Sequence, residues 1–373
     1  MNVSFQKLFF AIATIFAIFA ILILARAIII PLGFALLISF ILLPIANRFE
    51  KWGINNILSA VFSILIVILI LSGLIYIFSA QVVSISSEFS NFKEKILQVF
   101  ADATLYINNN MNFGQDIEKG ELMDKLKEWF SNSAGSLVQQ TFSSTASFFT
   151  GLLATIIFTF LILIYRKGLA NSFVKFYPES KKDQVLKMFK SVQQVGKKYL
   201  FGMMMMILIL GLANSIGLLI IGIDNPFLFG FLAGFLAIIP YIGTFIGAAI
   251  PILYAFFSYN SPWMAIAVAI LFWFVQLIES NFLSPKIVGD SLKINALAAI
   301  LSIIVGASVW GIAGMILFLP FTAMLRVICE EFEELKPIAL LIGEHNKKKS
   351  IDGTKIISKL KEEIISKISK KKG

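Results

Sequence analysis

The 373 residues are too apolar for a water-soluble protein. Hydrophobic residues make up 58% of the chain and charged residues 14%, with a mean hydropathy of +0.86, whereas soluble domains carry about a quarter charged residues. A single cysteine, Cys329, and a single histidine, His345, exclude an internal disulfide and a Cys/His metal cage. The net charge of +10 comes from lysines between apolar stretches and in the C-terminal tail, which is typical of membrane topology rather than of nucleic-acid binding.

Three apolar stretches open the chain. A helix needs about 20 apolar residues to cross a bilayer, and Leu8–Ala25, Ala27–Ala46 and Asn56–Ala80 meet that requirement. We expect a tight turn at Arg26, because the first two stretches in one rod would be about 58 Å long. Residues 1–80 are therefore predicted to form three N-terminal transmembrane spans.

Residues 81–143 have a different character, with five lysines against eight acidic residues. Apolar residues recur every three or four positions from Val82 to Val99, which predicts an amphipathic helix. We interpret this part as an extracytoplasmic helical segment that packs on itself or on a neighbouring protomer, and a ligand-binding lid is the alternative. Its continuous apolar stripe predicts a homo-oligomer.

A fourth span, Phe148–Tyr165, leads into a basic linker at 166–200. Residues 166–198 hold nine basic and two acidic residues. Because positive charge collects on the cytoplasmic side, the linker is predicted to be cytoplasmic and residues 81–143 to lie outside. The same count places the N-terminus and the basic tail, 326–373, in the cytoplasm.

Two later apolar stretches are interrupted by proline and glycine. Beyond a fifth span, Met203–Gly222, residues 225–258 would make one helix of about 50 Å, but Pro240, Gly243 and Gly247 lie in its middle. Residues 295–325 repeat the design around Gly306, Gly311 and Gly314. An uninterrupted span, Trp263–Ile278, lies between them.

These interruptions favour two re-entrant hairpins and six full crossings, with eight plain spans as the alternative. Irregular backbone at membrane depth is tolerated only where it is buried in protein or lines a cavity, and broken helices commonly line a transport site. Close packing through small residues is the other interpretation. The predicted fold is an all-α polytopic membrane protein whose transmembrane core is 144–325.

Few polar side chains lie within the spans, so each is a candidate for function. Glu279, with Gln276 and Asn281 close by, follows the Trp263–Ile278 span. A carboxylate there can bind a proton or a sodium ion in turn; an ordinary ion pair with Lys286 is the alternative. Asn214 is an amide within the fifth span, and it either lines the path or bridges two helices.

Several chemistries have no matching motif in the chain. There is no G-x-x-x-x-G-K-[ST] loop for ATP and no H-E-x-x-H motif for a metalloprotease. No nucleophile and base pair is visible either. We therefore expect neither an enzyme nor an ATP-driven pump, and no cofactor or bound metal.

Four segments together carry a family resemblance. They are VQQVGKKYLFG (Val192–Gly202), IIPYIGTFIGAAIP (Ile238–Pro251), IESNFLSPKIVGDSLKINAL (Ile278–Leu297) and GASVWGIAGMILFLPFTAML (Gly306–Leu325). This series closely resembles the autoinducer-2 exporter family of PerM-like bacterial permeases, over nearly the whole chain. The resemblance implies a multi-pass protein of the bacterial inner membrane; the family is named for export of a small furanone signal, and some relatives are assigned sodium/proton antiport.

The resemblance also implies which positions matter. Thr244 departs from a frequent proline, and Asn295–Ala296 from a frequent His-Pro pair, so a histidine-based proton relay is not expected here. The matching turn and helix-break positions, together with two polar positions, are Pro240, Gly243, Gly247, Pro251, Glu279, Asn281, Pro285, Gly289, Gly306, Gly311, Gly314 and Pro320.

The sequence thus predicts a secondary transporter that exports a small, autoinducer-2-like solute. Its path is expected between the two broken stretches and the Trp263–Ile278 span, lined by Gln276, Glu279, Asn281 and Asn214. The expected partners are lipid, further copies of the chain, and a small solute or monovalent cation, without nucleic acid. The alternatives are a Na⁺(Li⁺)/H⁺ antiporter and a non-transporting membrane scaffold.

Overall fold

A computed structural model of the chain describes residues 5–73, 76, 148–259, 261–289 and 292–344. In this part of the chain the elements are helices, and the β-structure consists of one isolated bridge between Ile294 and Gly343. The predicted amphipathic segment at 81–143 and the tail from His345 onward lie outside the described residues. The homo-oligomer inferred from that segment therefore stays a prediction.

The described helices follow the apolar pattern of the sequence and confirm an all-α polytopic membrane protein. Two π-helical turns, Glu279–Leu283 and Pro285–Gly289, extend α8, and a 3₁₀ turn, Glu333–Leu335, precedes α12. The helices are α1 (Phe5–Leu24), α2 (Arg26–Lys51), Asn56–Gly73, Phe148–Lys175, α5 (Glu179–Ile221), α6 (Pro226–Leu236), α7 (Ile242–Ser258), α8 (Pro262–Ile278), α10 (Ala296–Trp310), α11 (Ile312–Glu331) and α12 (Lys336–Ile342).

Six helices in the described ranges are long and apolar enough to cross a membrane. They include α11, which the sequence predicts to be half of a broken stretch, while the apolar part of α1 counts among the shorter helices at Ile12–Leu24. The number of candidate spans agrees with the prediction, although their identities differ in this respect. The choice between six crossings with hairpins and eight crossings stays a prediction.

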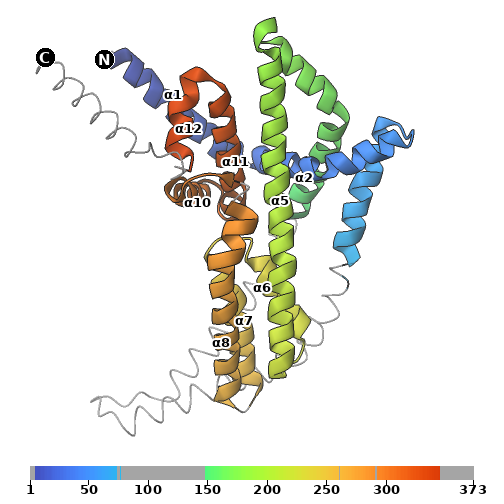
Figure 1. The fold of residues 1–373 in the computed structure, drawn as a ribbon, viewed down its shortest axis with the longest axis vertical. Helices are drawn as coiled ribbons and strands as arrows, with labels where there is room; N and C mark the ends of the chain where they lie inside the picture. Colours follow the sequence, from blue (N-terminus) through green and yellow to red (C-terminus); the bar gives the residue numbers. More distant parts are fainter. Residues whose placement is uncertain (1–4, 74–75, 77–147, 260, 290–291, 345–373) are drawn as a thin grey trace, which may run out of the picture.

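Helix α5 runs along the long axis of the molecule and is longer than the sequence indicated (Figure 1). The predicted linker at 166–200 is helical except for a short break before Pro178, where proline lacks an N–H and disfavours helix in the residue preceding it. At 43 residues, α5 is roughly 65 Å long, about twice the hydrocarbon thickness of a bilayer. Its lysine-rich first half therefore extends beyond the apolar layer.

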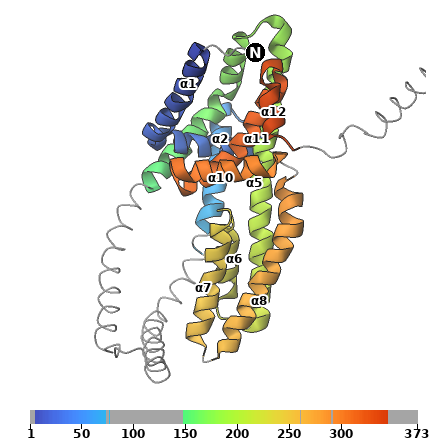
Figure 2. The same ribbon diagram turned by 90° about the vertical axis from the view of Figure 1, so that its left-hand side faces the viewer.

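Helices α6 and α7 form a hairpin beside the C-terminal half of α5 (Figures 1 and 2). Its two ends meet, because the Tyr259 hydroxyl accepts a hydrogen bond from the Asp224 backbone N–H and donates one to the Asp224 carboxylate, both at 2.8 Å. Its tip is the turn around Pro240, halfway along the molecule. The two helices are separated at Pro240, where the sequence predicts a break, and we call this pair the first hairpin.

Helices α10 and α11 form the second hairpin, which crosses the direction of α5 (Figure 2). Gly311, with φ of 61°, makes the turn, and only glycine adopts such a conformation without strain. Near the other end, Ser302 and Thr322 share a hydrogen bond of 2.7 Å, and Arg326 donates to the Lys293 carbonyl at 2.7 Å. The sequence predicts an interruption around Gly311.

Two apolar clusters hold these hairpins in place. The first hairpin packs with α5 and α8 through Leu218, Phe229 and Phe272. The second packs with α2 and α5 through Trp310 and Leu317, and the Trp310 indole donates to the Leu22 carbonyl at the end of α1 at 2.8 Å. Both hairpins approach α5 in the region that lies between these two apolar clusters.

Candidate functional site

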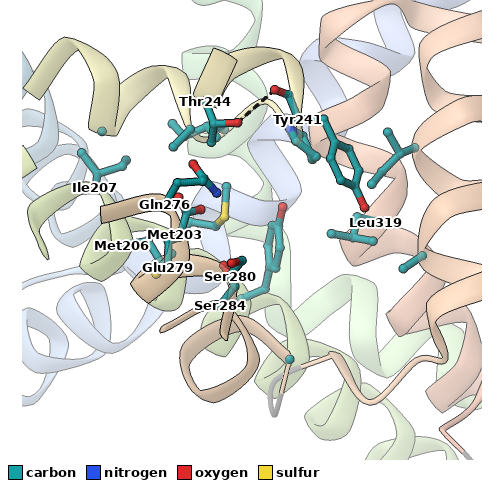
Figure 3. Close-up of a pocket in the computed structure, with 18 residues that line it drawn as sticks. Met203, Met206, Ile207, Tyr241, Thr244, Gln276, Glu279, Ser280, Ser284 and Leu319 are labelled. Carbon is teal, nitrogen blue, oxygen red and sulfur yellow. Dashed lines mark hydrogen bonds between the residues drawn. The ribbon is translucent and has the colours of Figure 1, made fainter. Parts of the chain in front are cut away.

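A cavity of about 410 Å³ lies where the two hairpins, α5 and α8 meet. The tip of the first hairpin and the helices of the second both contribute to its wall (Figure 3). A volume of this size suits a small organic molecule. The residues that line it are Tyr199, Met203, Met206, Ile207, Gly234, Ala237, Ile238, Pro240, Tyr241, Thr244, Gln276, Glu279, Ser280, Ser284, Gly289, Ala299, Ile303 and Leu319.

Gln276 and Glu279 are the most polar groups in this wall. They are three residues apart on α8 and its extension, so they lie on one helical face, and Figure 3 shows them adjacent, with Thr244 beside Gln276. Among the described lining residues Glu279 is the one carboxylate, and none is Lys, Arg or His. The cavity is therefore electronegative and suited to hydrogen-bond donors and cations.

The alternative ion pair between Glu279 and Lys286 does not occur. In the described ranges the salt bridges join other residues, and the Lys286 side chain is exposed. Glu279 is half-buried, so its charge is partly removed from water without a basic partner. Such a carboxylate gains by binding a proton or a cation.

The backbone at Glu279 departs from α-helical geometry. Two successive π-helical turns begin there, and such turns occur frequently at functional sites because they widen the helix and re-aim its side chains. Ser280 and Ser284 line the cavity from this segment. Asn281 lies on its exposed side, where its amide donates to the Leu277 carbonyl at 2.8 Å, and it lines neither described cavity.

The α5 side of the cavity was missed by the sequence analysis. Tyr199, Met203, Met206 and Ile207 line it at spacings of four, three and one residues, which place them on one helical stripe. The spacing alone could have identified a shared face. It could not have distinguished a cavity wall from ordinary packing.

The first hairpin comes close to α5 because small residues line its inner face. A Cβ atom at Gly234 would lie 2.8 Å from the Ile207 carbonyl oxygen and 2.9 Å from the Gly211 nitrogen, so a side chain there would push the helices apart. At the tip, Tyr241 has φ of +64°, and the Thr244 hydroxyl donates to the Tyr241 carbonyl at 2.9 Å. The cavity wall thus contains a strained, non-glycine turn.

A second, much smaller cavity of about 20 Å³ lies deeper, against α5. Thr244, Gln276 and Glu279 line both cavities, and Asn214 lines the small one. The Asn214 side chain is 4% exposed, and its Oδ1 atom has no hydrogen-bond partner in the described part of the chain. The helix bridge considered for Asn214 is therefore not made through this oxygen.

The predicted turn positions fall into three groups, of which one, Pro285 and Gly311, is exposed. Pro240 and Gly289 line the large cavity, whereas Gly243, Gly247, Pro251, Gly306, Gly314 and Pro320 are buried at helix contacts. Of the four polar residues predicted for the path, the structure brings together Gln276, Glu279 and Asn214 around the small cavity and leaves Asn281 outside.

Comparisons with known proteins agree with this architecture. The profile of the AI-2E family transporter matches residues 8–334. The Bacillus subtilis protein named "Putative transport protein YueF" is 29% identical over 309 residues, covering 79% of this chain and 82% of its own. The "AI-2 transport protein TqsA" of Escherichia coli is 24% identical over 328 residues, covering 87% of this chain and 91% of its own. With its two broken hairpins around a cavity, and with a family match over most of its length, the chain belongs to the AI-2E transporter family.

Proposed function

We propose that the chain is a secondary permease of the bacterial inner membrane that exports a small solute through the large cavity. Both termini lie in the cytoplasm, as the lysine distribution predicts, and the protein is not an enzyme. The first solute to test is autoinducer-2, because the relative TqsA is named for its transport.

The observation that carries the proposal is the position of the large cavity. It lies where two interrupted helices meet a partly desolvated carboxylate, Glu279. Interrupted helices at membrane depth free backbone and polar groups to contact a solute, and they are the usual surroundings of transport sites. In this proposal Gln276 and Glu279 contact the solute, and the first hairpin is the element that moves.

The test is solute efflux from proteoliposomes. Vesicles holding the purified protein are loaded with autoinducer-2, and its release is followed for wild type and for Glu279→Gln. We expect release by wild type and at least a tenfold slower rate for the variant, since the amide keeps the shape of the side chain but loses its charge. Glu334→Gln is the matched control, because Glu334 is exposed and has no ion pair among the described residues. Equal rates for wild type and Glu279→Gln would remove Glu279 from the path.

A Na⁺(Li⁺)/H⁺ antiporter is the second candidate, and the absence of a basic partner for Glu279 in the described ranges favours it. The same vesicles, given an inside-acid gradient and external sodium or lithium, distinguish the two. Collapse of the gradient in wild type but not in Glu279→Gln supports antiport. If neither ion collapses the gradient while solute release is intact, the exporter proposal is supported and the antiporter is excluded.

A non-transporting scaffold predicts a different pattern. In that case removal of residues 85–140 would abolish function, while Glu279→Gln and Gly243→Leu would leave it intact. Gly243 is buried against the Leu236 carbonyl at the tip of the first hairpin, so our proposal predicts the opposite for both substitutions.

A further inference from the structure

The small cavity beside the large one holds an unsatisfied oxygen atom. Asn214 is 4% exposed, and its Oδ1 atom has no hydrogen-bond partner in the described ranges. A buried acceptor without a partner is strongly unfavourable, and natural proteins rarely keep one unless a ligand or water satisfies it. Asn214 is one of the residues that line a cavity of about 20 Å³, which is enough for one small group.

The other polar groups around this cavity are also mainly acceptors. Glu279 supplies a carboxylate, and the Gln276 amide donates a hydrogen bond to it, which leaves the Gln276 oxygen as an acceptor. The Thr244 hydroxyl already donates its hydrogen to the Tyr241 carbonyl, so it too is left to accept. An occupant of this cavity must therefore donate hydrogen bonds, and an anionic group is excluded.

The two cavities share part of their walls. Four residues line both cavities and therefore place them side by side: Ala237, Thr244, Gln276 and Glu279. The remaining walls of the large cavity combine apolar side chains, such as Met203 and Leu319, with the hydroxyl groups of Ser280 and Ser284.

We propose that the small cavity is a subsite for one hydrogen-bond donor group of the transported solute, a hydroxyl or an ammonium, bound by Asn214, Gln276 and Glu279. The solute then presents a hydroxyl or an ammonium at one end, and carboxylates, sulfonates and phosphates are not substrates. This assignment rests on the proposed transport function and deepens it.

The test measures binding rather than transport, so that failure of the two proposals can be told apart. The purified protein in neutral detergent is heated with four probes of matched shape: cyclohexanol, cyclohexylammonium, cyclohexanone and cyclohexanecarboxylate. We expect the two donors to raise the unfolding temperature in a saturable way. The ketone, which only accepts, and the carboxylate are expected to have no saturable effect.

Two variants locate the effect. Asn214→Leu keeps the volume and removes the unsatisfied oxygen, and we expect donor binding to weaken roughly tenfold or more. Asn281→Leu is the matched control, because Asn281 lines neither described cavity. Glu279→Gln separates the two donors: cyclohexylammonium binding should be lost because the amide carries no charge, whereas cyclohexanol binding should be retained because the amide oxygen still accepts a hydrogen bond.

Three results would overturn the assignment. The first is equal stabilisation by cyclohexanone and cyclohexanol. The second is donor binding that survives in Asn214→Leu. The third is stabilisation by sodium chloride relative to choline chloride that Asn214→Leu abolishes while neither donor has any effect, since that would make the small cavity an inorganic ion site.

Discussion

Both hairpins are apolar stretches interrupted by proline or glycine, but they line the cavity with different parts. The first places its tip in the wall, where Pro240, Tyr241 and Thr244 face the cavity. The second turns at Gly311 and anchors its tip to α1 through the indole of Trp310. It contributes residues that lie away from its tip, namely Ala299, Ile303 and Leu319.

The difference in backbone conformation agrees with this division. The second hairpin turns at a glycine, which adopts a positive φ without strain, whereas the first holds Tyr241 at φ of +64°. A strained backbone conformation at a non-glycine residue is retained where the side chain of that residue has a function. We therefore regard the first hairpin as the mobile element that contacts the solute (the working hairpin). We regard the second as the stationary element that holds the first in place (the supporting hairpin).

The largest expected effect is on the free energy of unfolding, and it concerns the second hairpin. Gly306 and Gly314 bring the backbones of α10 and α11 into contact, and a Cβ atom at Gly306 would lie 2.6 Å from the Gly314 carbonyl carbon. We expect Gly306→Ala to lower the free energy of unfolding by about 3 kcal/mol, at the upper end of overpacking effects. The measurement is the temperature at which half the purified protein stays monodisperse.

The control for that substitution is Gly168→Ala. Gly168 is helical, and a Cβ atom added there would meet no atom within 4 Å beyond its own helix backbone, so alanine is expected to cost nothing. Similar losses for both variants would mean that the contact between α10 and α11 does not support the fold.

The next effect has the opposite sign and concerns the working hairpin. Tyr241→Gly removes a side chain from a strained turn, and we expect it to raise the free energy of unfolding by about 1 kcal/mol. Solute affinity should fall at the same time, because Tyr241 lines the large cavity. Thermal unfolding and efflux are both measured, with Tyr241→Phe, which keeps the strain and the ring, as the control. A loss of stability in Tyr241→Gly would contradict the assignment of strain.

An effect of similar size on stability distinguishes the tips of the two hairpins. Trp310→Phe deletes the hydrogen bond to the Leu22 carbonyl, and we expect it to cost about 1 kcal/mol of stability. Because the Trp310 side chain is outside the described cavity lining, solute affinity should not change. If affinity falls as far as it does in Tyr241→Gly, the two hairpins are not functionally different.

The smallest effect is at the base of the first hairpin. Tyr259→Phe removes the hydroxyl that joins Tyr259 to Asp224. This site is exposed, so we expect a loss of only about 0.5 kcal/mol, at the low end for a hydrogen bond. Hydrogen exchange of the α6 and α7 amides should nevertheless increase, because the two ends are no longer joined. Unchanged exchange would show that packing alone holds the base closed.

Much of this arrangement follows from particular residues in the sequence. Pro240 and Gly311 mark the two turns because one lacks an amide hydrogen and the other tolerates positive φ. Gln276 and Glu279 lie on one helical face because they are three residues apart. By the same reasoning Asn281, two residues beyond Glu279, should have been assigned to another face.

Other features depend on long-range packing that local patterns do not encode. The stripe of Tyr199, Met203 and Met206 looks like any buried helix face until both hairpins are placed against it. Thr244 stood out in the sequence only as a departure from the family pattern, yet it lines both cavities. The continuity of α5 was hidden by the change from a charged half to an apolar half.

The length of α5 has a mechanical consequence. No proline interrupts its 43 residues, so the basic half that extends beyond the apolar layer and the half that carries the cavity wall form one rod. A tilt of that rod about its contact with α2, where Gly196 lies against Phe40, swings Met203 and Met206 relative to the first hairpin. We therefore expect that a force on the lysines at one end of α5, such as attraction to the charged membrane surface, changes the width of the cavity at the other end.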